Sequence, residues 1–517
     1  MHGPKTLLSL PDDVMLEIIA FIRVNDVLSL RQTCKKLCKL TKSRWVWANA
    51  MRQHVIQKGL PIPASISGLK SLSAAHLEAR VVHAAKVHDN WYSAHPKPRQ
   101  AIEFQARCMI DEADGTPAHP VSQVAFMHAR SGEFLLVVAG TRLTCWEVPL
   151  DGSGAYEVMC VHKNGLFIQQ VVVNQDAHQG RGEFAFWARR WGEDGTAKLY
   201  IASLDTFRGR IEVKMSCSVP LQIGSPLHLM DGNFLLSGCP PVLWFLATHP
   251  KKPNRVLLNS SVPVEGSNAV LAAKIIGQYV LVAREQELLL FRMPDYSPED
   301  GVKGSASLLA TFHLGERACE AVIVTRGELG TSTASPFSKF WTTGTVTVLA
   351  HCKDGGPNTL AQYDFVPNLD LRPVPGTKKI FPFIIPPGPT RTIPVAPSFC
   401  GLSIRPSGRG YWIQTDNVEA NHMRYPARCI MGFDVVSPQQ ADAISAERDN
   451  VLPANHSNDQ PQANIVHFCE SPLYARRCDM SHILRKRYAF GAVALEDVIG
   501  RLAIGDKDGR IEVLDFA

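Results

Sequence analysis

Four potential zinc ligands lie close together near the C-terminal end of the sequence. His467-x-Cys469 and Cys478-x-x-x-His482 bring two histidines and two cysteines into one short stretch. Structural zinc sites usually contain paired Cys-x-x-Cys ligands, and this spacing is absent. The surrounding residues also have the pattern of strands. We interpret these four residues as ordinary core residues and predict no metal site.

A dense group of basic residues lies in the same region. It contains Arg476, Arg477, Arg485, Lys486 and Arg487. The plain interpretation is a solvated loop. The alternative is a substrate-binding surface that reads phosphate, because the planar arginine fork matches phosphate oxygens.

Motifs of common enzyme classes are missing. The sequence contains no Gly-x-x-x-x-Gly-Lys-Ser/Thr phosphate loop, no Gly-x-Ser-x-Gly nucleophile elbow and no His-Glu-x-x-His metalloprotease motif. We predict a non-catalytic binding protein that needs no cofactor.

The positive charge of the chain is concentrated at its N-terminal end. The 517 residues have a formal net charge of +6. Residues 1–100 hold 15 Lys/Arg against 6 acidic residues, a net charge of +9, so the rest has a net charge of −3. A basic coat for nucleic acid would extend over more of the chain, and the basic head lacks interleaved aromatic residues, so we expect no nucleic-acid partner.

Cysteine usage and hydropathy indicate the compartment. The 13 cysteines are odd in number and irregularly spaced, which favours reduced thiols over a disulfide framework. The N-terminus lacks the pattern of a secretory signal. The most apolar stretch, 270–283, is interrupted by Lys274 and Gln278 and is too short to span a bilayer. We expect a cytoplasmic and/or nuclear protein without a membrane partner.

The first hundred residues have the pattern of helices. Pro11 suits a first helical turn. Asn25 and Asp26 can cap a second helix, whose apolar positions Val27, Leu30, Cys34 and Leu37 recur at spacings of three and four. A third helix is expected over about 71–92. In the first helix, eight of the nine residues 14–22 are apolar, and Glu17 is the exception. Such a helix must be covered on several sides, either by its own chain or by another protein.

These helices carry a family resemblance. Leu8-Ser9-Leu10-Pro11-Asp12-Asp13-Val14, then 18–22, then Asp26-Val27-Leu28-Ser29-Leu30 with Cys34-Lys35-Lys36-Leu37, and finally Trp45 and Trp47, resemble the F-box. The match spans about a tenth of the chain. The helix around 77–92 with Pro96-Lys97-Pro98 resembles the linker helix between F-box and propeller in fungal proteins.

The resemblance implies a function and a set of contact residues. F-box proteins are substrate receptors of SCF ubiquitin ligases, in which a Skp-family adaptor joins the F-box to a cullin and its RING subunit. The resemblance implies adaptor contact for Leu10 and Pro11. It divides the other apolar positions between adaptor contact and module core, namely Val14, Ile18, Ile19, Ile22, Val27, Leu28, Leu30, Cys34 and Leu37.

Basic residues follow the second helix at helical spacing. Arg31, Lys35, Lys39 and Lys42 recur every three or four residues. Such a run is usually a solvated helix face. The alternative is electrostatic steering toward an acidic adaptor, which mainly raises the association rate.

After residue 100 the pattern becomes one of paired strands. Seven pairs of short apolar segments recur with a mean period of about 61 residues, longer than the roughly 40–45 residues of a WD repeat. The last pair, 501–505 and 510–515, is joined by Asp506-Lys507-Asp508-Gly509, a hairpin signal, and looks like a WD-type closing hairpin. The pattern favours a seven-bladed β-propeller over two tandem β-sandwiches.

We therefore expect an α+β multidomain chain. Its parts are a small helical F-box at 1–60, a helical linker at 61–98 and an all-β, propeller-like domain at 99–517 with a disordered insertion near 437–464. Two functions remain open. One is a receptor that binds an unknown protein substrate for an SCF ligase. The other is a propeller scaffold whose F-box binds the adaptor without directing ubiquitination.

Overall fold

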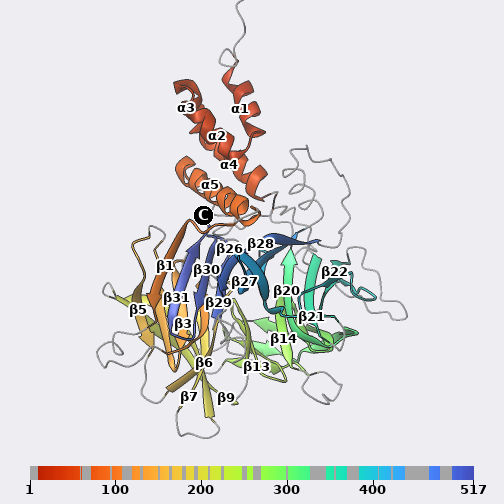
Figure 1. Ribbon diagram of the computed structural model, residues 1–517. Coiled ribbons are helices and arrows are strands. Elements are labelled where there is room, and N and C mark those ends of the chain that lie inside the picture. Colours follow the sequence, from red (N-terminus) through yellow and green to blue (C-terminus); the bar gives the residue numbers. More distant parts are fainter. Residues whose placement is uncertain are drawn as a thin grey trace, which may run out of the picture.

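The computed structural model consists of a helical head on a β-rich body (Figure 1). Among the residues that it describes, no helix is long and apolar enough to cross a membrane. The described residues are 10–56, 58, 60, 72–93, 96–106, 119–127, 132–149, 152–161, 166–176, 182–190, 196–207, 210–222, 226–246, 253–259, 269–297, 301–326, 345–353, 357–368, 383–405, 407–420, 423–436, 465–477 and 492–517.

The described part of the chain before the body contains five α-helices and a short π-helix, of which α1–α4 and the π-helix form the head and α5 links the head to the body. They are α1 (Asp12–Ala20), α2 (Val24–Arg31), α3 (Lys35–Thr41), α4 (Arg44–Ala50), the π-helix Met51–Ile56 and α5 (Ala74–Trp91). Asp12 and Asp13 lie in the first turn of α1, where the helix dipole favours acidic side chains. Ser43 and Ser73 cap α4 and α5, because each side-chain oxygen accepts a backbone N–H of the first turn.

The helix boundaries differ in detail from the sequence prediction. Pro11 is the N-cap of α1 rather than its first helical residue. The second helix begins at Val24, with Arg23 as its N-cap, so Asn25 and Asp26 lie inside it. The second predicted helix, which ran through Leu37, is two helices in the structure. The extended backbone of Cys34 interrupts the helix, and Cys34 is the N-cap of α3.

The body is a ring of seven sheets of four main strands each, a seven-bladed β-propeller. The first strand of each blade is innermost, because these strands contact one another from blade 1 to blade 6 and between blades 7 and 1. From the inside outward, blade 1 contains β2 (Val121–Phe126), β3 (Phe134–Ala139), β4 (Arg142–Glu147) and β5 (Tyr156–Val161). Blade 2 contains β6 (Leu166–Val173), β7 (Phe184–Arg190), β8 (Thr196–Phe207) and β9 (Arg210–Gln222). Blade 3 contains β10 (Leu227–Asp231), β11 (Phe234–Ser237), β12 (Val242–Phe245) and β13 (Asn254–Leu257).

The remaining blades follow the same plan. Blade 4 contains β14 (Val270–Ile276), β15 (Tyr279–Arg284), β16 (Glu287–Arg292) and β19 (Ser307–His313). Blade 5 contains β20 (Ala318–Arg326), β21 (Thr345–Cys352), β22 (Thr359–Pro367) and β24 (Arg391–Pro394), and β23 (Phe383–Ile384) also pairs with β22. Blade 6 contains β25 (Cys400–Ile404), β26 (Arg409–Ala420), β27 (Met423–Val436) and β28 (Ile465–Arg477). A ribbon of β17 (Asp295–Ser297) and β18 (Gly301–Lys303) is inserted in blade 4.

Blade 7 joins the two ends of the propeller sequence. It contains β29 (Ala492–Glu496), β30 (Arg501–Gly505), β31 (Arg510–Asp515) and, outermost, β1 (Gln100–Gln105). β1 pairs with β31 in antiparallel register from Gln100 opposite Asp515 to Gln105 opposite Arg510. The ring is therefore closed by backbone hydrogen bonds between the first strand of the body and the last.

All seven strand pairs expected from the sequence are the second and third strands of a blade. The structure also resolves the blade register. Four third strands contain an apolar or aromatic residue followed by an acid in their C-terminal half, at Trp146-Glu147, Tyr363-Asp364, Phe433-Asp434 and Leu514-Asp515. The chain therefore carries diverged counterparts of the Trp-Asp pair in four blades. The predicted insertion at 437–464 lies outside the described residues.

Side-chain amides fasten neighbouring blades to each other. Gln123 of blade 1 donates to the carbonyl of Val171 in blade 2 at 2.6 Å and accepts the N–H of the same residue at 2.9 Å. Gln170 makes the same pair of bonds to Leu227 in blade 3, each 2.8 Å long. These bonds satisfy both backbone groups on the inner strand of the next blade.

We predict that Gln170→Ala lowers the free energy of unfolding by about 1–3 kcal/mol, because it leaves both backbone groups of Leu227 without their partner. Equilibrium urea unfolding followed by circular dichroism measures this change. The control is Gln32→Ala, which truncates an exposed glutamine in the head. Equal urea midpoints for the two variants would contradict the prediction.

Candidate functional site

Helix α1 carries apolar side chains on two faces. Met15, Ile19 and Ala20 are buried against the rest of the head. Val14, Ile18 and Phe21, which we call the outer stripe, are 41%, 41% and 79% exposed. Their spacing of four and three residues places them on one side of the helix. The all-round apolar character seen in the sequence therefore divides into an inner face, covered by the chain itself, and an outer face, which this chain leaves exposed.

The structure separates the predicted contact residues into three groups. Ile19, Val27 and Leu37 are buried in the head. Pro11, Val14 and Ile18 are exposed. The half-buried residues, which can serve both roles, are Leu10, Ile22, Leu28, Leu30 and Cys34.

Sequence reasoning missed the most exposed member of the outer stripe. Phe21 was not among the predicted contact residues, although it lies seven residues after Val14 and three after Ile18. That periodicity was available in the sequence and could have identified it. Trp45 on α4 is a further exposed aromatic residue, at 43%.

The predicted run of basic residues does not lie on one helix. Arg31 belongs to α2, Lys35 and Lys39 belong to α3, and Lys42 follows α3. Lys35, Lys39 and Lys42 are exposed. Arg31 is not part of a solvated face, because its guanidinium turns inward to Glu78.

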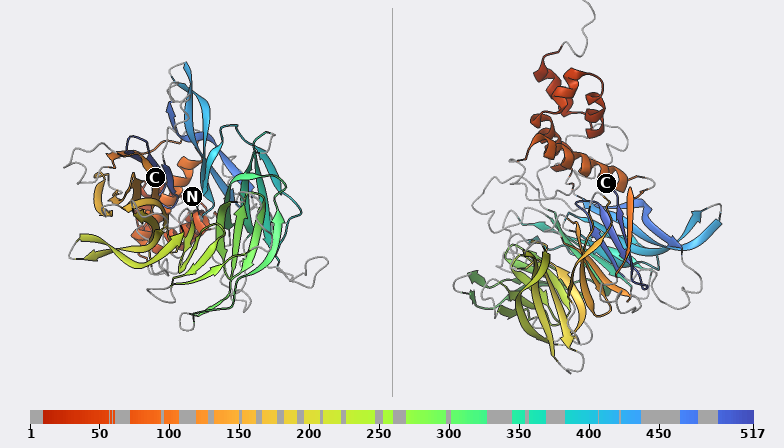
Figure 2. Two further views of the ribbon diagram at one scale, coloured as in Figure 1. Left: turned by 90° about the horizontal axis from the view of Figure 1, so that it is seen from below. Right: turned by 90° about the vertical axis from the view of Figure 1, so that its left-hand side faces the viewer.

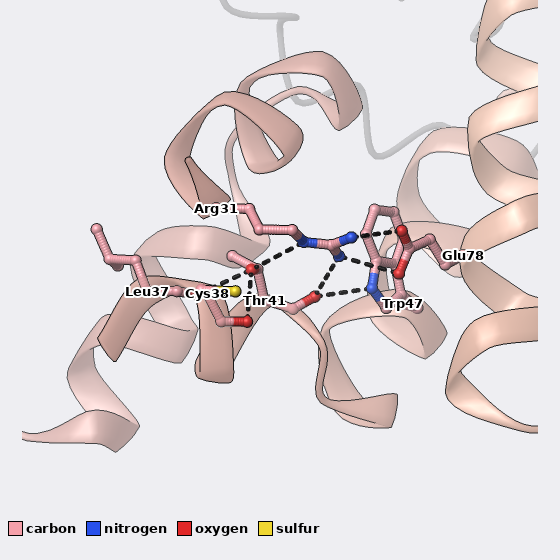
Figure 3. Close-up of polar contacts among 6 residues, drawn as sticks. All are labelled: Arg31, Leu37, Cys38, Thr41, Trp47 and Glu78. Carbon is pink, nitrogen blue, oxygen red and sulfur yellow. Dashed lines mark hydrogen bonds and ion pairs between the residues drawn. The ribbon is translucent and has the colours of Figure 1, made fainter. Parts of the chain in front are cut away.

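Arg31 and Glu78 join the head to helix α5 (Figure 3). The two Arg31 terminal nitrogens donate to the two Glu78 carboxylate oxygens at 2.6 and 2.9 Å, a bidentate ion pair. Arg31 also donates to the Thr41 carbonyl at 3.1 Å and lies 5.7 Å from the centre of the Trp47 ring. The hydrogen bonding of Arg31 to the Glu78 carboxylate raises the pKa of Arg31. The pair therefore fixes α2 and α4 against α5.

The other side of α5 lies on the propeller (Figures 1 and 2). His83 Nε2 is 3.1 Å from the carbonyl of Ile499, and burial lowers the pKa of this histidine. Val87 packs on Gly500, whose φ of +72° and close contact leave no room for a side chain. Asn90 donates to the carbonyl of Phe516 at 2.8 Å. The helix is thus held by the head and by the last blade at the same time.

The remaining candidate residues are only partly described. Arg476 and Arg477 lie on β28, the outermost strand of blade 6, opposite Arg428 and Ala427. Arg485, Lys486 and Arg487 lie outside the described residues. The phosphate-reading surface therefore stays a prediction.

The four potential zinc ligands are also only partly described. His467 and Cys469 lie on β28, and Cys478 and His482 lie outside the described residues. In the part of the chain that the structure covers, no three metal-binding side chains come together.

Comparisons with known proteins identify the head. Residues 7–49 match the family model of the F-box domain. No curated protein sequence matches the chain. The WD40 domain of SCAP from fission yeast is a structural neighbour at 8% sequence identity and a TM-score of 0.38, covering 77% of this chain and 82% of that one. The propeller assignment itself follows from the sheet topology described above.

We predict that Glu78→Ala loosens the head from α5, because it leaves the half-buried Arg31 guanidinium without its carboxylate. Native-state hydrogen exchange of the α2 and α4 amides should speed up about 5- to 100-fold, which corresponds to roughly 1–3 kcal/mol. Glu17→Ala, which removes an exposed acid from α1, is the control. Unchanged protection in Glu78→Ala would show that the ion pair does not hold this junction.

Proposed function

We propose that this protein, an F-box domain on a seven-bladed β-propeller, is the substrate-recognition subunit of an SCF-type ubiquitin ligase. In this proposal the F-box docks a Skp-family adaptor, the adaptor connects to the cullin and RING subunits, and the propeller binds the protein substrate. The chain itself contributes binding and positioning, and the chemistry of ubiquitin transfer belongs to its partners.

The observation that supports the proposal most strongly is the outer stripe of α1. Val14, Ile18 and Phe21 present apolar surface on a helix whose other face is already buried. Covering a large aliphatic or aromatic side chain contributes about 1.5–3 kcal/mol, and a few such anchors usually carry most of the affinity of an interface. An F-box that presents three of them is suited to tight adaptor binding.

Exposed charge on the head suits the same partner. Lys35, Lys39 and Lys42 are exposed on the head, and Skp-family adaptors are acidic. Exposed charges at the rim of an interface mostly raise the association rate, and they do so less at high salt. We infer that these lysines guide the adaptor to the head, whereas Arg31 is committed to Glu78.

The junction through α5 suits a ubiquitin ligase receptor. Ubiquitin transfer requires a substrate lysine to reach the charged enzyme on the other side of the complex. A receptor whose adaptor-binding and substrate-binding parts are joined by one packed helix restricts that search and lowers its entropic cost. In this chain α5 is tied to the head by Glu78 and to blade 7 by His83 and Asn90.

We predict that the double change Ile18→Ala/Phe21→Ala weakens adaptor binding at least about 30-fold, because two anchors of the outer stripe are truncated. Titration calorimetry with a purified Skp-family adaptor measures the affinity. Leu257→Ala/Ile384→Ala is the matched control, since these side chains are 44% and 52% exposed but lie on the propeller. Undiminished binding by the α1 variant would refute the contact assignment, and absence of any binding by the wild-type chain would refute the proposed function.

A second prediction separates a substrate receptor from a scaffold. The full chain with Ile18→Ala/Phe21→Ala should still capture its propeller partners but should no longer direct their ubiquitination. Quantitative proteomics should find that the captured proteins accumulate in cells that carry this variant, with Leu257→Ala/Ile384→Ala as the control. If the captured proteins keep their wild-type abundance, the chain is a scaffold whose F-box does not direct ubiquitination.

A further inference from the structure

Helix α5 ends inside the contact between blades 6 and 7, which we call the seam. Trp91, the last residue of the helix, is 1% exposed. It belongs to one apolar cluster with side chains from both blades, which include Tyr411, Ile430 and Leu473 of blade 6 and Leu495, Leu502, Ile504, Leu514 and Phe516 of blade 7. A linker helix that merely rested on the body would not place its largest side chain between two blades.

Blades 6 and 7 have an arginine at the same position, the first residue of the second strand, and the two arginines make different contacts. Arg501 is the first residue of β30 and pairs in register with Asp515. Its guanidinium continues across the blade boundary and donates to the carbonyls of Val148 and Pro149 in blade 1. It therefore ties blade 7 directly to its neighbour.

In blade 6 the matching arginine contacts the helix instead. Arg409 is the first residue of β26 and pairs in register with Asp434. It is 2% exposed, and its guanidinium lies 4.7 Å from the centre of the Trp91 ring, a cation–π contact removed from solvent. The arginine at this position thus binds the neighbouring blade in blade 7, whereas in blade 6 it binds α5.

Two hydrogen bonds complete this connection. The hydroxyl of Tyr92 donates to Asp434 of blade 6. The side chain of Asn90 donates to the carbonyl of Phe516, which follows the last strand of blade 7. Asn90 in the last turn of α5 and Tyr92 at its C-cap therefore bind to opposite sides of the seam.

Direct contact between the two blades also exists and lies beside the helix. The hydroxyl of Tyr411 in blade 6 donates to the carbonyl of Val493 in blade 7 at 2.7 Å. Burial raises the pKa of this tyrosine to about 12, so the phenol keeps its proton and remains a donor over the physiological range. The hydroxyl of Ser407 in blade 6 also donates to Asp497 in blade 7, and an Arg405 nitrogen lies 4.0 Å from a Glu496 carboxylate oxygen. The seam thus has several direct polar contacts beside the apolar contact that includes α5.

We propose that the C-terminal half of α5 is a structural part of the propeller, a wedge that holds blades 6 and 7 together. The seam is then the place where the ring opens when the helix is displaced. On this view the structural unit of the propeller begins near His83, inside the predicted linker at 61–98, and α5 couples the head to the binding body. The proposal does not depend on which partner the F-box binds.

Trp91→Ala in the full chain tests the wedge. Hydrogen exchange followed by mass spectrometry should show about 10- to 100-fold faster exchange in β26, β27, β30 and β31, because the variant leaves a cavity between the two blades. Blades 2 and 3 should keep their wild-type protection. A rise confined to α1–α5, or an equal rise in all seven blades, would overturn the proposal.

Two other buried tryptophans provide matched controls. Trp187 is 5% exposed between blades 2 and 3, so Trp187→Ala should raise exchange there and leave the seam protected. Trp47 is buried in the head, so Trp47→Ala should raise exchange in α1–α4 without opening the seam. Seam exchange in Trp47→Ala that matches Trp91→Ala would mean that the head, and not the wedge, stabilises the ring.

A milder variant serves if Trp91→Ala does not fold. Tyr92→Phe removes only the hydroxyl that binds Asp434 and keeps the ring. We expect faster exchange at the seam by about 3- to 30-fold, with unchanged exchange in blades 2 and 3. Unchanged exchange at the seam would contradict a connection of blade 6 to α5 through this bond.

Discussion

The pairing of β1 with β31 is the constraint on which the arrangement of the molecule depends. It closes the propeller by joining strands that are about four hundred residues apart in the sequence. Because α5 precedes β1 closely, closing the ring also brings α5 to blade 7 (Figure 2). The position of the head therefore follows from the closure of the body, and the contacts of His83, Asn90 and Trp91 develop from it.

The head shows how one short helix can serve two surfaces. α1 has too few polar positions to face water on one side, and its inner face is already used by Met15 and Ile19. Phe21 is 79% exposed, so its ring contributes little hydrophobic stabilisation to the folded chain alone. Burying the ring in an interface would contribute that free energy to binding. Residues 14–21 thus stabilise the module with one face and expose the outer stripe on the other.

Buried charges in this protein act as ties between elements. Arg31 connects α2 to α5 through Glu78, Arg409 connects blade 6 to Trp91, and Arg501 connects blade 7 to blade 1. Each guanidinium has several donors and a flat apolar face, so it can satisfy carbonyls or a carboxylate and stack on an aromatic ring. The position of an arginine in the sequence did not reveal which role it has. The predicted solvated run contained Arg31, which is instead a connection between elements.

Local pattern was enough to determine much of the protein from the sequence. The apolar repeat located α1, α2, α5 and all seven strand pairs of the propeller, because alternation and helical period depend on neighbouring residues. The F-box was recognised from its resemblance to the family, and α4 and the π-helix were not predicted. Tertiary structure alone decided the rest. Whether Ile18 or Ile19 stays exposed and which charge Arg31 meets depend on other helices of the head and on α5, with Glu78 lying 47 residues after Arg31. Where Trp91 is buried depends on blades hundreds of residues away, which reach it only when the ring closes. Burial and pairing across such distances leave no periodic signal in the sequence.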